Sequence, residues 1–253
     1  MSRVLAQALA GGGFALVAIA LSWRFGIGRE RELAGATVRA YVQLAAVGAL
    51  IALVFAVPAL GVAFVALMVV TASVTAGGRL SWLPQGRLRA LVAIAVPAVS
   101  ATAVLVAVGA FAFTPRAAVP AAGILIGGAL AATTLRGRRL AEGLRADTDE
   151  IEARLALGAD ARTALEPLAH RAVHTGLIPI LDQTRSVGLV TLPGTFVGLV
   201  LGGAAPEQAA AAQLVVLLAL LAVQLGSGLL IVELIQRAVI LPGERVARID
   251  VGV

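Results

Sequence analysis

The most metal-like pattern in the sequence is a stripe of three possible ligands at helical spacing. Glu166, His170 and His174 follow one another at intervals of four residues. On a helix this spacing places the three side chains on one face, and imidazole nitrogens with a carboxylate oxygen can bind Zn²⁺ and similar ions. The same spacing also arises by chance on an interfacial helix. Two interpretations therefore stay open: a metal site and an ordinary polar helix face.

Polar residues inside apolar stretches are candidates for a transport path. Arg39 and Gln43 lie four residues apart, hence on one helix face. An arginine inside a membrane span is costly unless its stem reaches the interface or it meets a partner, and both alternatives stay open for Arg39. Gln43 lies one turn deeper and is expected to face other helices. Gln213 is a second amide in an apolar stretch.

The Pro193-Gly194 pair interrupts another apolar stretch. Proline removes one helical hydrogen bond, and glycine permits close approach of backbones. Broken helices at membrane depth are tolerated where they line a cavity or pack against protein. The pair is predicted to form a gate or part of a cargo path, with a simple packing kink as the alternative.

Motifs for catalysis are missing from the sequence. It lacks G-x-x-x-x-G-K-[ST], G-x-S-x-G and H-E-x-x-H, and no apolar stretch carries a pair of carboxylates. It also contains no cysteine, which excludes disulfides and thiolate metal sites. The chain is therefore predicted not to be an enzyme, and it cannot itself be an ATPase of the phosphate-loop type.

The composition is that of a membrane protein. Apolar residues make up 60% of the 253 residues and charged residues only 13%, whereas soluble domains carry about 25% charged residues. All 20 basic residues are arginine, and they lie mainly in short loops without interleaved aromatic residues. The formal charge of +6 therefore indicates basic membrane-protein loops and not a nucleic-acid surface.

The elements that must position these residues are membrane-spanning helices. The predicted fold is all-α: one polytopic membrane-spanning domain, residues 1–253, with seven transmembrane helices and an amphipathic helical segment between spans five and six. Each apolar run is about 17 residues or longer, which is the length needed to cross a bilayer core. The predicted spans are residues 4–23, 38–57, 59–76, 91–111, 119–135, 187–203 and 212–236.

Arginine counts in the loops predict the orientation. The loops after spans one, three, five and seven are rich in arginine, and the alternate loops contain at most one charged residue. Cytoplasmic loops retain basic residues. The protein is therefore expected in a plasma (inner) membrane with its N-terminus outside and its C-terminus in the cytoplasm. An odd number of spans is required by this result.

Residues 136–186 form the predicted cytoplasmic segment. They hold eight arginines and eight of the 14 acidic residues, and they predict amphipathic helices at about 135–157 and 162–175. Within them, Glu152, Ala153, Arg154 and Gly158 follow the pattern E-A-x-x-x-x-G. A helix that ends at a glycine can take a left-handed cap and act as a rigid lever. A solvated charged face is the simpler alternative.

Several sequence blocks in fixed order resemble the FetB-type ABC transporter permease family, which is associated with iron export and, in plant relatives, with aluminium tolerance. The similarity covers nearly the whole chain and is strongest between residues 151 and 213. The blocks are IEARLALGA at 151–159, GLIPILD at 176–182, SVGLVTLPG at 186–194, LGGAAPEQA at 201–209 with Gln213, RAYVQL at 39–44, and Pro120 with Gly123, Gly127 and Gly128.

The resemblance implies a permease subunit that forms a homodimer in the lipid bilayer and pairs with a separate ABC-type ATPase. ATP and Mg²⁺ would bind in that partner, and this chain would need no cofactor of its own. Glu152, Ala153, Arg154 and Gly158 would couple the two proteins. The implied cargo is iron or another metal ion. A nucleotide sugar or other small solute, and an ATP-independent carrier or channel, remain alternatives.

Two departures from the family pattern bear on the cargo. Members tend to have methionine after the Pro-Gly pair and asparagine in the fifth span. Here the corresponding stretches are GTFVG at 194–198 and GGAL at 127–130. If those side chains contact a soft metal in relatives, the cargo of this protein is expected to differ.

Overall fold

A computed structural model describes residues 3–112, 114–243 and 245–247 of the chain, and most of them are helical. The chain divides into two compact units, Met1–Val57 and Pro58–Val253. Each unit is described by itself.

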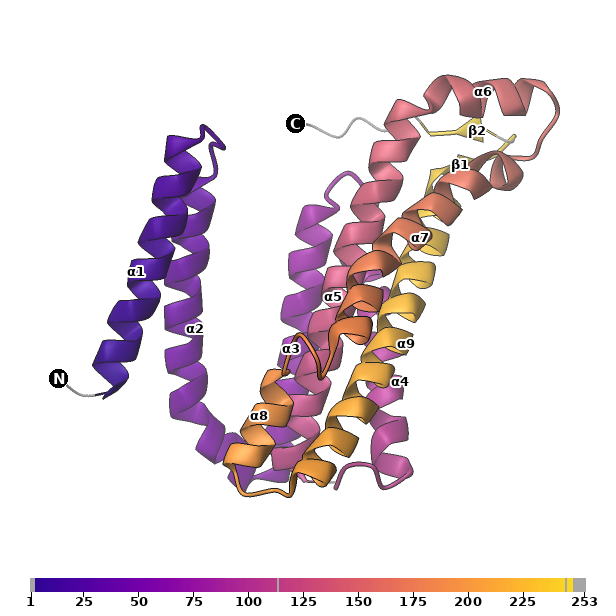
Figure 1. Ribbon diagram of the computed structural model, residues 1–253. Coiled ribbons are helices and arrows are strands. Elements are labelled where there is room, and N and C mark those ends of the chain that lie inside the picture. The colour runs from indigo at the N-terminus through magenta and orange to yellow at the C-terminus, as the bar shows by residue number, and fades with distance from the viewer. Residues whose placement is uncertain (1–2, 113, 244, 248–253) are drawn as a thin grey trace. The chain divides into compact units, whose positions relative to one another are not determined.

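The first unit is a hairpin of two apolar helices, α1 (Arg3–Arg24) and α2 (Glu30–Ala56) (Figure 1). The Ser22 hydroxyl donates to Glu30 Oε1 at 2.7 Å and closes the connecting turn. Further along, the Tyr41 hydroxyl donates to the carbonyl oxygen of Ala8 at 2.5 Å. A Cβ at Gly11 would lie 2.9 Å from that hydroxyl, so the glycine is what lets the tyrosine cross to α1.

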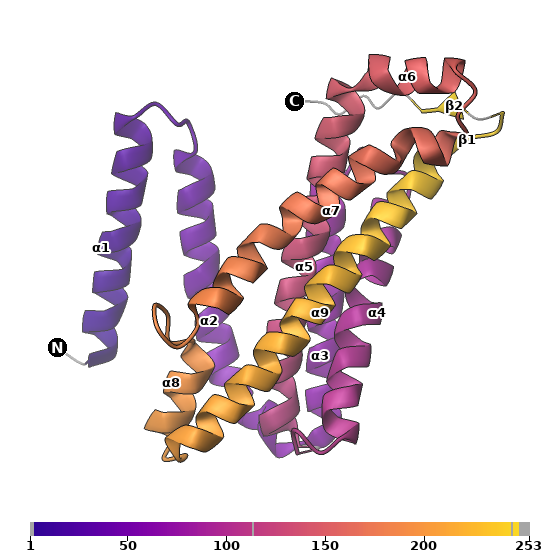
Figure 2. The same ribbon diagram turned by 45° about the vertical axis from the view of Figure 1, so that its right-hand side comes forward.

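The second unit is a bundle in which α5 packs against α3, α4, α7 and α9. Figures 1 and 2 show the long helices running alternately up and down, with α6 lying across one end. The helices are α3 (Pro58–Arg79), α4 (Gly86–Ala107), α5 (Pro115–Ala146), α6 (Thr148–Ala156), α7 (Ala161–Ser186), α8 (Gly194–Leu201) and α9 (Pro206–Val239). A short antiparallel pair, β1 (Ile240–Leu241) and β2 (Arg245–Val246), follows α9.

Small residues allow these helices to approach closely. A Cβ at Gly123 of α5 would lie 2.8 Å from the end of Met68 on α3, and one at Gly128 would overlap Leu220 on α9. Small residues at the contacts are the usual means by which helices pack in lipid, because the hydrophobic effect does not drive their association there. Leu125 and Ala129 of α5 are fully buried in the core cluster that these helices form.

Six helices of the described residues are long and apolar enough to cross a membrane: α1, α2, α3, α4, α5 and α9. They overlap six of the seven predicted spans. The boundaries differ most at α2, which begins eight residues earlier than predicted, and at α5, which continues well beyond residue 135. The α5 extension is held by packing, because Leu140 and Leu144 are buried in a core cluster with α7 and α9.

The structure differs from the prediction between residues 187 and 203. Only α8, eight residues long, is helical there, and a helix of that length covers about 12 Å. Gly188 has φ +87° and its N–H donates to the Thr191 carbonyl, which ends the helical path before Pro193. In Figures 1 and 2, α7 and α8 together run the length of the unit. The predicted sixth span is therefore not one continuous helix, and the count of seven spans stays a prediction.

The segment predicted as two helices also has different boundaries. The helix expected at about 135–157 is divided at Asp147 into the end of α5 and α6. The helix expected at about 162–175 is longer and runs to Ser186. The predicted periodicity is visible in the burial of Leu140, Leu144 and Ile151.

Substitution of Gly77 by alanine is expected to lower the thermal stability of the protein. A Cβ there would lie 2.6 Å from the Cα of Arg87, on the backbone of the next helix. Backbone cannot yield as a side-chain tip can, so a cost of about 1–3 kcal/mol is expected for the overpacked site. Thermal unfolding in detergent measures it. Gly78→Ala is the matched control, because nothing lies within 4 Å of a Cβ there; equal melting temperatures for the two variants would contradict the packing.

Candidate functional site

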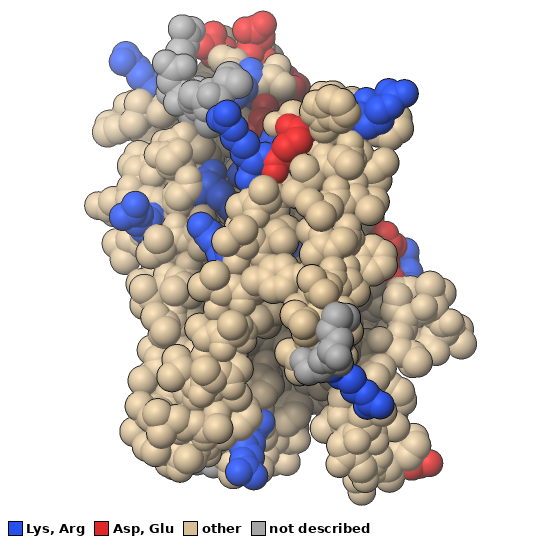
Figure 3. All heavy atoms as spheres, turned by 90° about the vertical axis from the view of Figure 1, so that its left-hand side faces the viewer, with Lys and Arg blue, Asp and Glu red and all other residues tan. Residues whose placement is uncertain are grey.

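Charged side chains gather at one end of the second unit, here called the polar end: α6, the first turns of α7 and the last turns of α9. Figure 3 shows Asp, Glu and Arg side chains at the top of the view, the level at which α6 lies in Figure 1. Three of the four residues predicted to couple to a partner lie on α6, and the fourth lies just beyond it. The polar end therefore holds the whole predicted coupling motif.

The end of α6 is a glycine-terminated cap. Gly158 has φ +92°, a conformation that residues other than glycine adopt at a cost. Its N–H donates to the Leu155 carbonyl at 3.0 Å, and the Ala159 N–H donates to the Arg154 carbonyl at 3.1 Å. These two bonds form a Schellman motif. They confirm the geometry predicted for Gly158 and turn the chain sharply toward α7.

The cap leaves a large apolar side chain in the open. Leu157, the C-cap residue of α6, is 89% exposed. The opposite face of α6 is anchored, because Ile151 is buried and packs with Leu165 and Leu168 of α7. Leu157 therefore projects from a fixed helix end.

Arg154 is oriented within the protein and does not lie free. Its guanidinium pairs with Glu150 at 2.5 Å, and its other terminal nitrogen donates weakly to the Ala164 carbonyl of α7 at 3.5 Å. Ala153 contributes its carbonyl oxygen to the bond that ends α6 at Leu157. Arg154 and Ala153 thus help to hold the helix end in place.

Ion pairs join α7 to its neighbours at the polar end. Arg171 of α7 pairs with Asp147 at the junction of α5 and α6. Arg162 of α7 pairs with Glu233 of α9 at 2.7 Å, and Glu233 also accepts from Arg237 at 2.7 Å. The spacing of four residues alone predicts the Glu233–Arg237 pair, and the structure contains it. Through these pairs α6, α7 and α9 are linked side chain to side chain.

The first turn of α7 is capped by Asp160. Its carboxylate accepts from the Thr163 N–H at 2.7 Å and from the Thr163 hydroxyl at 3.1 Å. These bonds favour the ionised carboxylate and hold the pKa of Asp160 below its ordinary value. The cap fixes the direction in which α7 leaves the turn at Gly158.

The contribution of Asp160 to stability is expected to depend on pH. A carboxyl whose pKa is lowered in the folded state stabilises the fold above its unfolded pKa, near 4, and that stabilisation is lost as the pH falls through the folded pKa. Asp160→Ala should therefore be less stable than wild type at pH 7, and the difference should shrink at acid pH. Asp160→Asn keeps the cap without the charge and should show a flatter dependence. Thermal unfolding from pH 3 to 8 checks this; a constant difference between Asp160→Ala and wild type over that range would contradict it.

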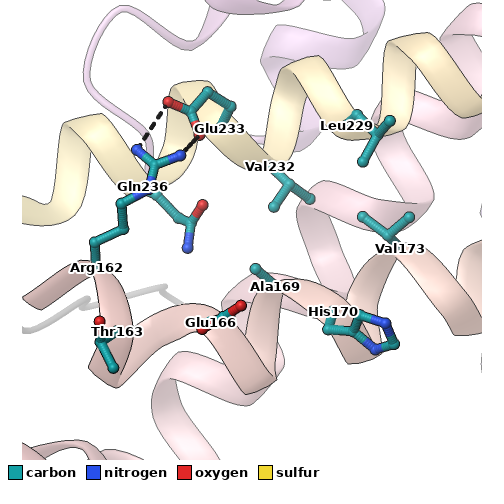
Figure 4. Close-up of a pocket in the computed structure, with 10 residues that line it drawn as sticks. All are labelled: Arg162, Thr163, Glu166, Ala169, His170, Val173, Leu229, Val232, Glu233 and Gln236. Atoms are coloured by element: carbon teal, nitrogen blue, oxygen red, sulfur yellow. Dashed lines mark hydrogen bonds and ion pairs between the residues drawn. The ribbon is translucent and has the colours of Figure 1, made fainter.

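A pocket of about 390 Å³ lies between α7 and α9 at the polar end. Figure 4 shows Arg162 reaching across it to Glu233, with Gln236 beside them. Glu166 and His170 line the α7 side. Its walls thus carry both charges and an amide.

The structure does not assemble the predicted metal stripe into a site. Glu166 and His170 line the pocket, but His174 does not. The two imidazole rings stack with their centroids 6.3 Å apart. Among the described residues, no group of three His, Asp or Glu side chains lies close enough together to hold a metal ion. The polar-face interpretation of this stripe fits the geometry better.

The predicted path residues fall into separate places. Pro193 caps α8 and Gly194 begins it, at the broken segment partway along the bundle in Figures 1 and 2. Gln213 is buried on α9, with no hydrogen bond to its Oε1 from the described residues. Arg39 and Gln43 are exposed on α2 of the first unit. The structure places α8 against α9, so it brings the elements of Pro193, Gly194 and Gln213 together.

Two functional candidates are not evident from the sequence. In the sequence, Leu157 is an ordinary apolar residue within the coupling motif. Only the structure of the helix cap shows that its side chain projects outward. Arg136 counts among the loop arginines by its position in the sequence, yet it is fully buried within the bundle. Its place directly after the apolar run of α5 is the available signal.

Six long apolar helices, a helix broken partway through the bundle and one polar end define a multi-pass α-helical membrane protein. The chain belongs to the Uncharacterised protein family (UPF0014), which it matches over residues 5–240. No solved structure matches it.

Three relatives show the range of this similarity. The chain is 36% identical to "UPF0014 membrane protein STAR2" of Oryza sativa, over 79% of this chain and 71% of the relative. It is 33% identical to "Protein ALUMINUM SENSITIVE 3" of Arabidopsis thaliana, over 80% and 75%. It is 30% identical to "Probable iron export permease protein FetB" of Escherichia coli, over 81% and 80%. The predicted family is confirmed.

Proposed function

We propose that this chain is the membrane-spanning permease subunit of an ABC-type transporter, which exports iron or another metal ion with energy from a separate ATPase subunit. The cargo assignment follows the name of the FetB relative. The ATPase binds ATP and Mg²⁺, and this chain supplies the path through the bilayer.

The observation that carries the proposal is the exposed Leu157 at the capped end of α6. An apolar side chain that is 89% exposed at a charged helix end is suited to a partner's apolar groove. Burying one leucine side chain contributes about 1.5–3 kcal/mol. Because Gly158 fixes the turn and Ile151 anchors the helix, little freedom is lost on docking. The partner in this proposal is the ATPase.

Movement of the partner would reach the membrane through α7. The contacts of Ile151 and the Asp147–Arg171 pair make α6 and the start of α7 move together. At its other end α7 meets the broken segment at Val187–Thr191, where the chain can bend without breaking helical hydrogen bonds. A rigid-body shift of α6 would thus displace α7 against α8 and α9, which opens and closes the path by alternating access.

The polar end of the second unit also sets the expected orientation of the protein in the membrane. The polar end carries the arginine-rich loops, so it faces the cytoplasm, where the ATPase is found. The protein lies in the plasma (inner) membrane with its N-terminus outside and its C-terminus inside. ABC ATPases act in pairs, so the transporter contains two copies of this chain, a homodimer, each with one docking end.

Transport in proteoliposomes tests the function. The chain is reconstituted with an ABC-type ATPase subunit that co-purifies with it, and ATP-dependent movement of Fe²⁺, Mn²⁺, Zn²⁺ and a nucleotide sugar is measured. ATP-dependent movement of a metal ion supports the proposal. Movement of the nucleotide sugar alone would contradict the proposed metal-ion cargo. Transport without the ATPase would contradict the assignment to the ABC transporter class.

A further inference from the structure

Arg136 is a buried cation in a slot made by two glycines. It lies on α5, with its side chain fully buried. A Cβ at Gly176 of α7 would lie 2.6 Å from Arg136 Cγ, and one at Gly228 of α9 would overlap Arg136 Cδ. Each neighbouring helix therefore has a glycine, with no side chain, at the point where the Arg136 side chain passes. The slot would close for any larger residue at either position.

The guanidinium in this slot has no partner among the described residues. None of its three nitrogens makes a hydrogen bond, and all are screened from solvent. An unpaired charge is among the most unfavourable groups to bury. A purely structural arginine would pair with a carboxylate, as Arg162 and Arg171 do at the polar end. Snorkelling to the interface does not apply, because the side chain is not exposed.

Other buried hydroxyls on α5 and α9 also lack partners among the described residues. Thr133 precedes Arg136 by three residues on α5, and Ser227 adjoins Gly228 on α9. Both are fully buried, and neither hydroxyl makes a hydrogen bond within the described part of the chain. The slot itself therefore holds the unpaired guanidinium, and the described ion pairs bring no carboxylate to Arg136.

We propose that Arg136 binds an oxyanion between α5, α7 and α9. A planar guanidinium matches the two oxygens of a phosphate or carboxylate group. The inference does not rest on the proposed function. It adds a ligand class, a phosphate- or carboxylate-bearing molecule, and it places this ligand against α7.

Thermal unfolding of the full chain in phosphatidylcholine nanodiscs tests the site. Inorganic phosphate and citrate are titrated in turn, and a third arm replaces part of the lipid by phosphatidylglycerol. A rise in melting temperature with a soluble anion assigns a free ligand. A rise only with phosphatidylglycerol assigns a lipid headgroup. Both results support the site, whereas no rise in any arm overturns it.

Variants tie the response to Arg136. Arg136→Gln should abolish the response and should melt higher than wild type without anion, because it removes the unpaired charge. Arg136→Lys, which keeps the charge and serves if the glutamine variant does not fold, should raise the dissociation constant at least tenfold because it loses the two-pronged contact. Arg138→Gln is the matched control, since Arg138 is exposed on the same helix. An undiminished response in the Arg136 variants would overturn the proposal.

Discussion

Leu157→Asp is expected to weaken the pairing of this chain with its ATPase by at least tenfold while leaving the fold intact. The leucine side chain is 89% exposed, so the permease alone loses no packing. At the interface the variant loses about 1.5–3 kcal/mol of apolar burial and must also desolvate a carboxylate. A loss of about 1.4 kcal/mol is already tenfold in affinity. Co-purification and titration of the ATPase against the variant in nanodiscs measure the effect.

The matched control for that experiment is Leu157→Met, which conserves volume and apolar character and should bind as wild type does. Melting temperatures of wild type and both variants confirm that the fold is kept. Undiminished pairing of the Leu157→Asp protein would show that the ATPase docks elsewhere.

A continuous helix through the broken segment is expected to abolish transport without releasing the ATPase. The double variant Gly188→Ala and Pro193→Ala removes a residue at φ +87° and a proline that cannot continue a helix. Both changes favour one continuous helix from α7 into α8. The transport path would then lose the flexible break between these two helices. ATP-dependent flux should fall to the background level, while the variant should still co-purify with the ATPase.

The control for the broken segment is Gly198→Ala within α8. Nothing lies within 4 Å of a Cβ at Gly198, so this change should leave flux unaltered. Wild-type flux in the double variant would mean that the break is a packing kink, which is the alternative noted from the sequence.

Apolar length and glycine placement explain what could be predicted. The six candidate spans and the mainly helical fold follow from apolar runs that only lipid or a bundle core can cover. Gly158 could be predicted as a left-handed cap because few other residues take that conformation. The family could be recognised because several blocks occur in fixed order.

Tertiary packing explains what could not be predicted. The stretch at 187–203 is apolar enough to suggest a span, but Gly188 turns the chain and only α8 remains helical. The slot around Arg136 depends on Gly176 and Gly228, which are 40 and 92 residues away along the chain. No periodicity in α5 itself reports those two neighbours.

Cross-linking from a single cysteine tests the central claim that the end of α6 docks on the ATPase. The natural chain has no cysteine, so Leu157→Cys introduces a unique thiol without a background. Labelled with a short thiol-linked photo-cross-linker in the assembled transporter, the Leu157→Cys protein is predicted to give an adduct with the ATPase subunit. Leu201 is similarly exposed and is the last residue of α8, which lies at the opposite end of the second unit from α6 in Figure 1, so Leu201→Cys should give none. An adduct from the Leu201→Cys protein but not from the Leu157→Cys protein would contradict both the docking site and the orientation.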